Sequence, residues 1–287
     1  MALIGAYLIR QQQEKRLAKT KEDPRAVLKP TSFRYFRRFE RSLLGKLARA
    51  SRLFSPLLPA HAPIRCQTYE CVQSRTDRRL FIFLPGLGDI LEDYEFYGFI
   101  EAVRQSGRSA DMVVADLHFG YYLRRTVIER LRNDIVLPAR RNGYEEIDLV
   151  GISLGGLGSL YYAIEHPAEI RRLFLLAPYV GDQRIVREIV AAGGVRRWHA
   201  EKVAEHDYQR KLWRWLKSYG SESTLPELYL GYGEQDKFAP GNRLLGEVLA
   251  EGHVCTVVGS HNWLTWSRLW KILLSREATG RKGSPVL

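Results

Sequence analysis

The chain has 287 residues, 45% of them hydrophobic and 26% charged, which is typical of a globular protein with a substantial core. The formal net charge is +12, but residues 1–60 hold 14 Lys and Arg against 4 Asp and Glu, so most of this charge lies in an N-terminal extension. No run of 18 or more apolar residues occurs, so we expect no transmembrane helix, and any anionic partner is expected at the extension and not at the nearly neutral remainder.

Three cysteines, Cys66, Cys71 and Cys255, are an odd number without metal-ligand spacing. This pattern favours buried thiols in a reducing compartment over a Cys66–Cys71 disulfide. Residues 1–9 are apolar, but they lack the basic flank and the cleavage site of a signal peptide. We therefore expect a cytoplasmic protein, with peripheral membrane association as an open question.

Residues 33–54 show the periodicity of a basic amphipathic helix. Its apolar side would carry Phe33, Phe36, Phe39, Leu43, Leu44, Leu47, Ala50 and Phe54, and its basic side Arg34, Arg37, Arg38, Arg41, Arg49 and Arg52. Three interpretations are open: packing on the rest of the chain, binding to an anionic membrane surface, and binding to nucleic acid. The absence of a nucleic-acid-binding motif makes the last the weakest.

Pro56, Pro59 and Pro63 follow this segment and interrupt regular structure. The sequence therefore predicts a boundary near residue 60, with the extension at 1–60 and a main domain at 61–287.

The main domain alternates between expected strands and expected helices. The strands are predicted at 64–73, 80–84, 111–115, 147–150, 172–176, 227–230 and 253–258. The helices are predicted at 94–106, 125–142, 157–166, 184–192, 201–219, 242–251 and 263–275. Strands 80–84 and 111–115 are continuous apolar runs, which are typical of strands covered by helices on both faces. The pattern predicts an α/β fold with a doubly wound, mostly parallel sheet.

The most informative motif is Gly-Ile-Ser-Leu-Gly-Gly at 151–156, between an expected strand and an expected helix. This order is that of a nucleophile elbow, in which a sharp turn exposes the hydroxyl of Ser153. Capping of the following helix is the alternative role for this serine. The missing Lys-Ser/Thr pair argues against a phosphate-binding loop.

Two further loops follow expected strands and carry an acid and a histidine. Asp236 lies in the loop after 227–230, where Glu234 competes with it, and His261 lies in the loop after 253–258. Parallel strands bring such loops to one edge of the sheet. We therefore expect Ser153 as the nucleophile, His261 as its base and Asp236 as the acid that orients the imidazole.

An acyl-transfer site also needs backbone donors for the oxyanion. We predict the N–H groups of Leu154 and of Leu87, the latter in the Pro-Gly-Leu-Gly-Asp loop at 85–89. His118 and Trp263 are further candidates for the substrate pocket, since each lies in or near a loop that follows an expected strand. No histidine spacing suits a metal, and no cofactor is expected.

These motifs resemble the α/β-hydrolase superfamily over roughly residues 64–275. Gly151–Gly156 is similar to the family's elbow, and Gly231-x-Gly233-x-x-Asp236 to its acid loop. Gly259-Ser-His261-Asn-Trp263-x-x-Trp266 is similar to the histidine loop of esterase-D-like carboxylesterases. Pro85 stands where the family usually has a histidine in its oxyanion loop. The resemblance implies that residues 181–225 form a short helical cap.

The resemblance implies a serine hydrolase that cleaves a carboxylic ester or a thioester of a small molecule through an acyl-enzyme at Ser153. Two alternatives remain: an acyltransferase that uses the same three residues, and a non-catalytic protein of this fold that binds a membrane or a partner through residues 1–60. The sequence does not specify the acyl chain or the oligomeric state.

Overall fold

The computed structural model describes residues 58–71, 78–200, 202–219 and 225–279. All of these residues belong to one compact unit of the chain. The amphipathic helix predicted at 33–54 lies outside the described residues, as does nearly all of the extension at 1–60. The partner of this segment and the boundary near residue 60 therefore stay predictions.

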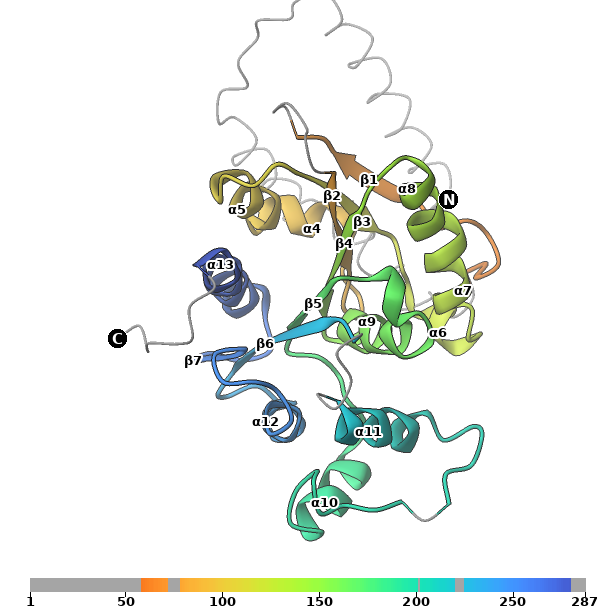
Figure 1. Cartoon of the computed structure of the whole chain (residues 1–287), viewed down its shortest axis with the longest axis vertical. Helices are drawn as coiled ribbons and strands as arrows, with labels where there is room; N and C mark the ends of the chain where they lie inside the picture. Colours follow the sequence, from red (N-terminus) through yellow and green to blue (C-terminus); the bar gives the residue numbers. More distant parts are fainter. Residues whose placement is uncertain (1–57, 72–77, 201, 220–224, 280–287) are drawn as a thin grey trace, which may run out of the picture. The chain divides into compact units, whose positions relative to one another are not determined.

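The described residues form a seven-stranded sheet in the order β1-β3-β2-β4-β5-β6-β7 (Figure 1). Every neighbouring pair is parallel except β1 and β3, which are antiparallel. The strands are β1 (Cys66–Tyr69), β2 (Arg79–Leu84), β3 (Ala110–Ala115), β4 (Glu146–Ile152), β5 (Arg172–Leu176), β6 (Glu227–Gly233) and β7 (Val254–Val257). The expected mostly parallel α/β fold is confirmed.

Helices cover both faces of the sheet, which explains the apolar strands. Helices α4, α5 and α13 lie on one side, and α7, α8 and α9 lie on the other (Figure 1). Residues 80–84 of β2 are at most 1% exposed, because they pack against both helical layers. The order of the strands reverses beside β2, since β3 and β4 flank it on opposite sides. Ligand sites of open α/β sheets lie at such a reversal.

The helices differ from the sequence prediction where single residues interrupt them. The structure has α4 (Leu91–Phe96), α5 (Phe99–Gln105), α6 (Phe119–Leu123), α7 (Val127–Leu131), η3 (Arg132–Val136), α8 (Leu137–Arg141), α9 (Leu154–Glu165), η4 (Pro167–Glu169), α10 (Gln183–Ala191), α11 (Tyr208–Ser218), α12 (Ala239–Gly246) and α13 (Trp263–Thr279). The helix predicted at 94–106 is broken by Gly98, whose φ of 77° is left-handed. The helix predicted at 125–142 contains the π-helical turn η3, where Pro138 supplies no N–H for the carbonyl of Asp134.

The segment predicted as a cap contains α10 and α11 between β5 and β6. Its tryptophans Trp198 and Trp213 are buried and form part of the core. The indole N–H of Trp198 donates to Glu188 Oε1 at 2.9 Å, and that of Trp213 donates to the carbonyl of Val180 at 2.8 Å. These two side chains therefore hold the segment together.

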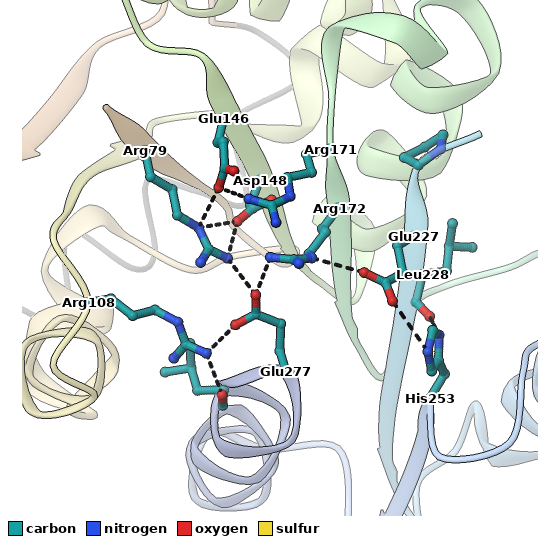
Figure 2. A network of polar contacts seen from close by, with 12 residues as sticks. Arg79, Arg108, Glu146, Asp148, Arg171, Arg172, Glu227, Leu228, His253 and Glu277 are labelled. Carbon is teal, nitrogen blue, oxygen red and sulfur yellow. Dashed lines mark hydrogen bonds and ion pairs between the residues drawn. The ribbon is translucent and has the colours of Figure 1, made fainter. Parts of the chain in front are cut away.

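An ionic network links the amino ends of the parallel strands (Figure 2). Glu277 of α13 pairs with Arg79 of β2, Arg172 of β5 and Arg108. The other members are Glu146 and Asp148 of β4, Arg171, Glu227 of β6 and His253. The network lies at the opposite edge of the sheet from the loops that carry Ser153, Asp236 and His261.

The cysteine expectation needs one correction. Cys66 is exposed and Cys71 is half-buried, whereas Cys255 is buried, and all three are free thiols. Cys66 lies on β1, an edge strand whose outer side has no neighbour within the described sheet. The expectation that all three thiols are buried is therefore wrong for Cys66.

Candidate active site

Ser153 occupies a strained turn between β4 and α9. Its φ of 51° and ψ of −110° lie in a region that side chains rarely adopt, and strain of this kind is concentrated at functional sites. The turn requires glycine on both sides of Ser153, at Gly151 and at Gly155. A Cβ on Gly155 would lie 2.0 Å from the carbonyl oxygen of Leu84, and one on Gly151 would lie 2.5 Å from that of Gly155. The local sequence thus permits the close approach of α9 to β2 that the elbow needs.

Backbone hydrogen bonds hold the elbow from the side of β5. The N–H of Ser153 donates to the carbonyl of Leu176 at 3.0 Å, and the N–H of Tyr179 donates to the carbonyl of Ser153 at 2.9 Å. Ser153 is 7% exposed, so it is largely buried. Helix α9 begins at Leu154, and the N–H groups of a first helical turn have no acceptor within the helix. The elbow therefore presents a helix N-terminus beside the hydroxyl.

The structure brings Ser153, His261 and Asp236 into one chain of hydrogen bonds. The distance from His261 Nε2 to Ser153 Oγ is 3.0 Å, and that from His261 Nδ1 to Asp236 Oδ2 is 2.7 Å. The Asp236 side chain is fully buried and also accepts the backbone N–H of Phe238 at 2.8 Å. A buried carboxylate with two donors fixes the tautomer in which Nδ1 carries the proton, which leaves Nε2 as the acceptor for the serine hydroxyl.

The loops of Asp236 and His261 are tied together by their backbones. The N–H of Gln235 donates to the carbonyl of Gly259 at 3.0 Å, and the N–H of Glu234 donates to that of Val257 at 2.9 Å. These bonds continue the pairing of β6 with β7 beyond the strands. Glu234 itself is exposed, whereas Asp236 is the acid that contacts His261.

Aromatic rings hold the imidazole of His261 on two sides. The rings of Phe238 and Trp266 each meet it edge-on with centroids 4.9 Å away. Trp266 belongs to the histidine motif, so the sequence carried a signal for this contact. Phe238 is two residues from Asp236 and had no such signal. Both rings restrict rotation of the imidazole away from Ser153.

The remaining predicted residues lie around this centre. Gly86 of the loop at 85–89 approaches Ser153, because an added Cβ there would lie 3.3 Å from the Cβ of Ser153. Leu87, the next residue, is 65% exposed. His118 caps α6, since its Nδ1 accepts the N–H of Gly120 at 3.1 Å. Trp263 is buried at the start of α13, where its ring stacks on that of Tyr97 with centroids 4.9 Å apart.

Within the described ranges, no group of three His, Cys, Asp or Glu side chains is arranged to hold a metal ion. In the same part of the chain, no helix is long and apolar enough to cross a membrane.

Comparisons with known proteins agree with the observed topology. A family model described as alpha/beta hydrolase fold matches residues 79–194, which include β2 to β5 and the elbow. Est1E from Butyrivibrio proteoclasticus superposes with a TM-score of 0.52 at 16% identity, over 76% of this chain and 93% of that chain. The chain has the α/β-hydrolase fold.

Two other solved structures are similar at lower scores. S-formylglutathione hydrolase (FrmB) from Staphylococcus aureus shares 14% identity at a TM-score of 0.47, over 69% of this chain and 80% of that chain. MGS-MChE2, an alpha/beta hydrolase from the metagenome of lagoon sediments of Mar Chica, Morocco, shares 15% identity at 0.48, over 77% of this chain and 94% of that chain. No curated protein sequence matches the chain.

The α/β-hydrolase fold accounts for the position of each loop. Ser153 follows β4 and the loop at 85–89 follows β2, so both lie where the strand order reverses. The acid and the histidine follow β6 and β7 at the same edge. The fold that the sequence resemblance implied is thus confirmed.

Proposed function

We propose that the chain is a serine hydrolase that cleaves a carboxylic ester or a thioester of a small molecule through an acyl-enzyme at Ser153. The observation that carries this proposal is the continuous hydrogen-bonded chain from Asp236 through His261 to Ser153, with distances of 2.7 and 3.0 Å. Capping of α9 explains Ser153 less well, because its side chain makes no cap hydrogen bond to the helix.

In the first half of the reaction, Nε2 of His261 takes the proton of the Ser153 hydroxyl as Oγ attacks the acyl carbon. Asp236 stabilises the imidazolium that forms. In this scheme the N–H groups of Leu154 and Leu87 donate hydrogen bonds to the oxyanion of the tetrahedral intermediate. The imidazolium then returns its proton to the leaving alcohol or thiol, and the acyl group remains on Ser153.

In the second half, water takes the place of the leaving group. His261 removes a proton from the water as it attacks the acyl-enzyme, and the proton passes to Ser153 Oγ when the acid is released. The same base therefore acts in both directions, as microscopic reversibility requires. An alcohol in place of water would give acyl transfer, so the products distinguish the two outcomes.

The first experiment is labelling with a fluorophosphonate probe. We expect the wild-type chain to be labelled and Ser153→Ala to remain unlabelled, with a loss of ester turnover on the order of 10⁴–10⁶-fold. Ser260→Ala is the matched control, because Ser260 adjoins His261 but its hydroxyl accepts from Asn262 Nδ2 at 2.7 Å. Equal labelling of the wild type and Ser153→Ala would refute the proposal.

The second experiment addresses the substrate. A panel of p-nitrophenyl esters and acyl-CoA thioesters of increasing chain length gives the preferred acyl group. Adding a primary alcohol to the same reactions and separating the products measures transfer against hydrolysis. Formation of the free acid as the main product supports a hydrolase.

A further inference from the structure

The loop at 85–89 is closed by one of its own side chains. The carboxylate of Asp89 accepts the N–H of Gly86 on Oδ2 at 2.9 Å, and the N–H of Asp89 donates to the carbonyl of Gly86 at 3.3 Å. Together these two bonds fix the backbone of Gly86 and Leu87. They also engage the N–H of Gly86, and the next N–H along this loop is that of Leu87, the proposed oxyanion donor.

The second oxygen of the same carboxylate reaches a distant part of the chain. Oδ1 of Asp89 accepts the indole N–H of Trp263 at 3.1 Å, across 174 residues of sequence. Trp263 is the first residue of α13 and lies two residues after His261. Asp89 therefore joins the loop after β2 to the segment that carries the base.

The indole of Trp263 is itself firmly held. The residue is 8% exposed, and its ring stacks on that of Tyr97 at an interplanar angle of 6° and meets the rings of Tyr94 and Phe99 edge-on. A buried ring with neighbours on several sides cannot shift without disturbing the core. Trp263 thus provides a fixed point for Asp89.

The loop that Asp89 holds lies against the nucleophile. A Cβ on Gly86 would lie 3.3 Å from the Cβ of Ser153, so even a small outward movement of this backbone changes the space above the serine. Oxyanion donors stabilise a transition state only when they stand within hydrogen-bond distance of the developing charge. The position of the Leu87 N–H is therefore sensitive to the bonds made by Asp89.

We propose that Asp89 is a positioning residue that aligns the oxyanion loop with Ser153, and that Trp263 acts through it as an anchor. This inference rests on the proposed function. It gives Trp263 a role in holding the loop, in place of the substrate contact considered from the sequence. Neither side chain needs to touch the substrate for this role.

The test compares variants that remove one or both bonds. Asp89→Ala removes both acceptors, Asp89→Asn keeps one oxygen but turns an amide toward the other donor, and Trp263→Phe removes only the indole N–H. The matched control is Trp270→Phe on the same helix, because the buried indole of Trp270 also donates one hydrogen bond, to the carbonyl of Phe99 at 3.1 Å.

The readout is hydrolysis of p-nitrophenyl acetate and of its thiono analogue, in which sulfur replaces the carbonyl oxygen. Sulfur accepts hydrogen bonds weakly, so a working oxyanion hole favours the oxygen ester. We expect Asp89→Ala to lower kcat by about 10- to 100-fold with little change in KM, and to lower the oxygen-to-sulfur rate ratio. Asp89→Asn and Trp263→Phe should follow with smaller losses, and Trp270→Phe should keep the wild-type ratio.

An unchanged ratio in Asp89→Ala and Trp263→Phe, or an equal fall in Trp270→Phe, would overturn the inference. Amide hydrogen exchange at Gly86 and Leu87 gives a second readout that needs no turnover. Faster exchange in Trp263→Phe than in Trp270→Phe supports the anchor, and equal exchange refutes it. If the wild type neither reacts with the fluorophosphonate nor hydrolyses esters, the proposed function fails, and the exchange rates still decide the role of Asp89.

Discussion

At the scale of single residues, the elbow depends on the absence of side chains more than on their presence. Ser153 keeps its strained backbone because α9 approaches the end of β2 closely, and this approach leaves no room at Gly155. The carbonyl of Leu84 is a backbone atom that other contacts of the sheet fix in place. A side chain at this position therefore cannot be accommodated by a rotamer change.

We predict that Gly155→Ala lowers the free energy of unfolding by about 3 kcal/mol or more, at the upper end of overpacking effects, and abolishes labelling of Ser153. The physical reason is the 2.0 Å approach of the new Cβ to the Leu84 oxygen. The matched control is Gly246→Ala at the end of α12, where the nearest atom would be 3.6 Å away. Its effect should stay within about 1 kcal/mol, as helix propensity allows. Urea unfolding of both variants provides the measurement, and similar losses would contradict the prediction.

The three residues of the hydrogen-bonded chain could be selected from the sequence because each lies in a short motif after an apolar strand. The bond from Trp263 to Asp89 could not be foreseen in the same way. It joins two segments that no local pattern relates, and it depends on the packing of α13 against α4 and α5. The same limit applies to Phe238, whose contact with His261 depends on how the acid loop turns.

At the scale of elements, the strands were predictable and the helix boundaries were not. Buried parallel strands appear in sequence as continuous apolar runs, and all seven expected strands are present in the described residues. Helix α6 has five residues, too few for a helical period to be seen. The break at Gly98 and the π-helical turn before Pro138 replace regular helix because one residue adopts a left-handed φ and the other lacks an N–H.

Helix α13 is held at both ends, and its far end depends on Glu277. The side chains of Glu277, Arg79, Arg108 and Arg172 are 6–12% exposed, so this charge is shared among three largely buried guanidinium groups (Figure 2). The ion pairs of Glu277 hold α13, the helix that follows His261, against the amino ends of β2 and β5.

We predict that Glu277→Gln lowers the free energy of unfolding by roughly 3–5 kcal/mol, because breaking a buried ion pair leaves uncompensated charge behind. Glu101→Gln is the control, since Glu101 is exposed on α5 and its carboxylate accepts a hydrogen bond from the side-chain amide of Gln105 at 2.9 Å. A surface change of this kind should alter stability by no more than about 0.5 kcal/mol. Equal unfolding midpoints for the two variants would show that the ion pairs of Glu277 add no stability.

At the scale of the whole molecule, the two ends of the parallel strands carry different groups. The carboxyl ends of the strands carry Ser153, Asp236 and His261, and the amino ends carry the ionic network. The network contains four arginines and four carboxylates, so the protonation of any one carboxylate changes its net charge. Its titration should therefore appear in the stability of the whole domain.

Asp148 makes this expectation specific. Burial raises the pKa of its carboxyl from 3.8 to about 6, even though Arg79 opposes the shift. The folded state thus binds this proton more tightly than the unfolded state does. The contribution of Asp148 to stability is fully present below about pH 4 and is lost as the pH rises through 6, by roughly 3 kcal/mol in total.

Asparagine cannot titrate, so the difference in unfolding free energy between wild type and Asp148→Asn isolates this contribution. We predict that the free energy of unfolding of the wild type, measured relative to that of Asp148→Asn, falls by roughly 3 kcal/mol between pH 4 and pH 7 and is constant above that range. Asp182→Asn is a control of opposite sign, because the backbone N–H of Ile185 lowers the pKa of Asp182 at the start of α10. Its stabilising effect should be lost as the pH falls. Urea unfolding at several pH values measures both. A wild-type advantage over Asp148→Asn that grows with pH would contradict the assignment, because it would mean that the pairing with Arg79 outweighs burial and favours the charged carboxylate.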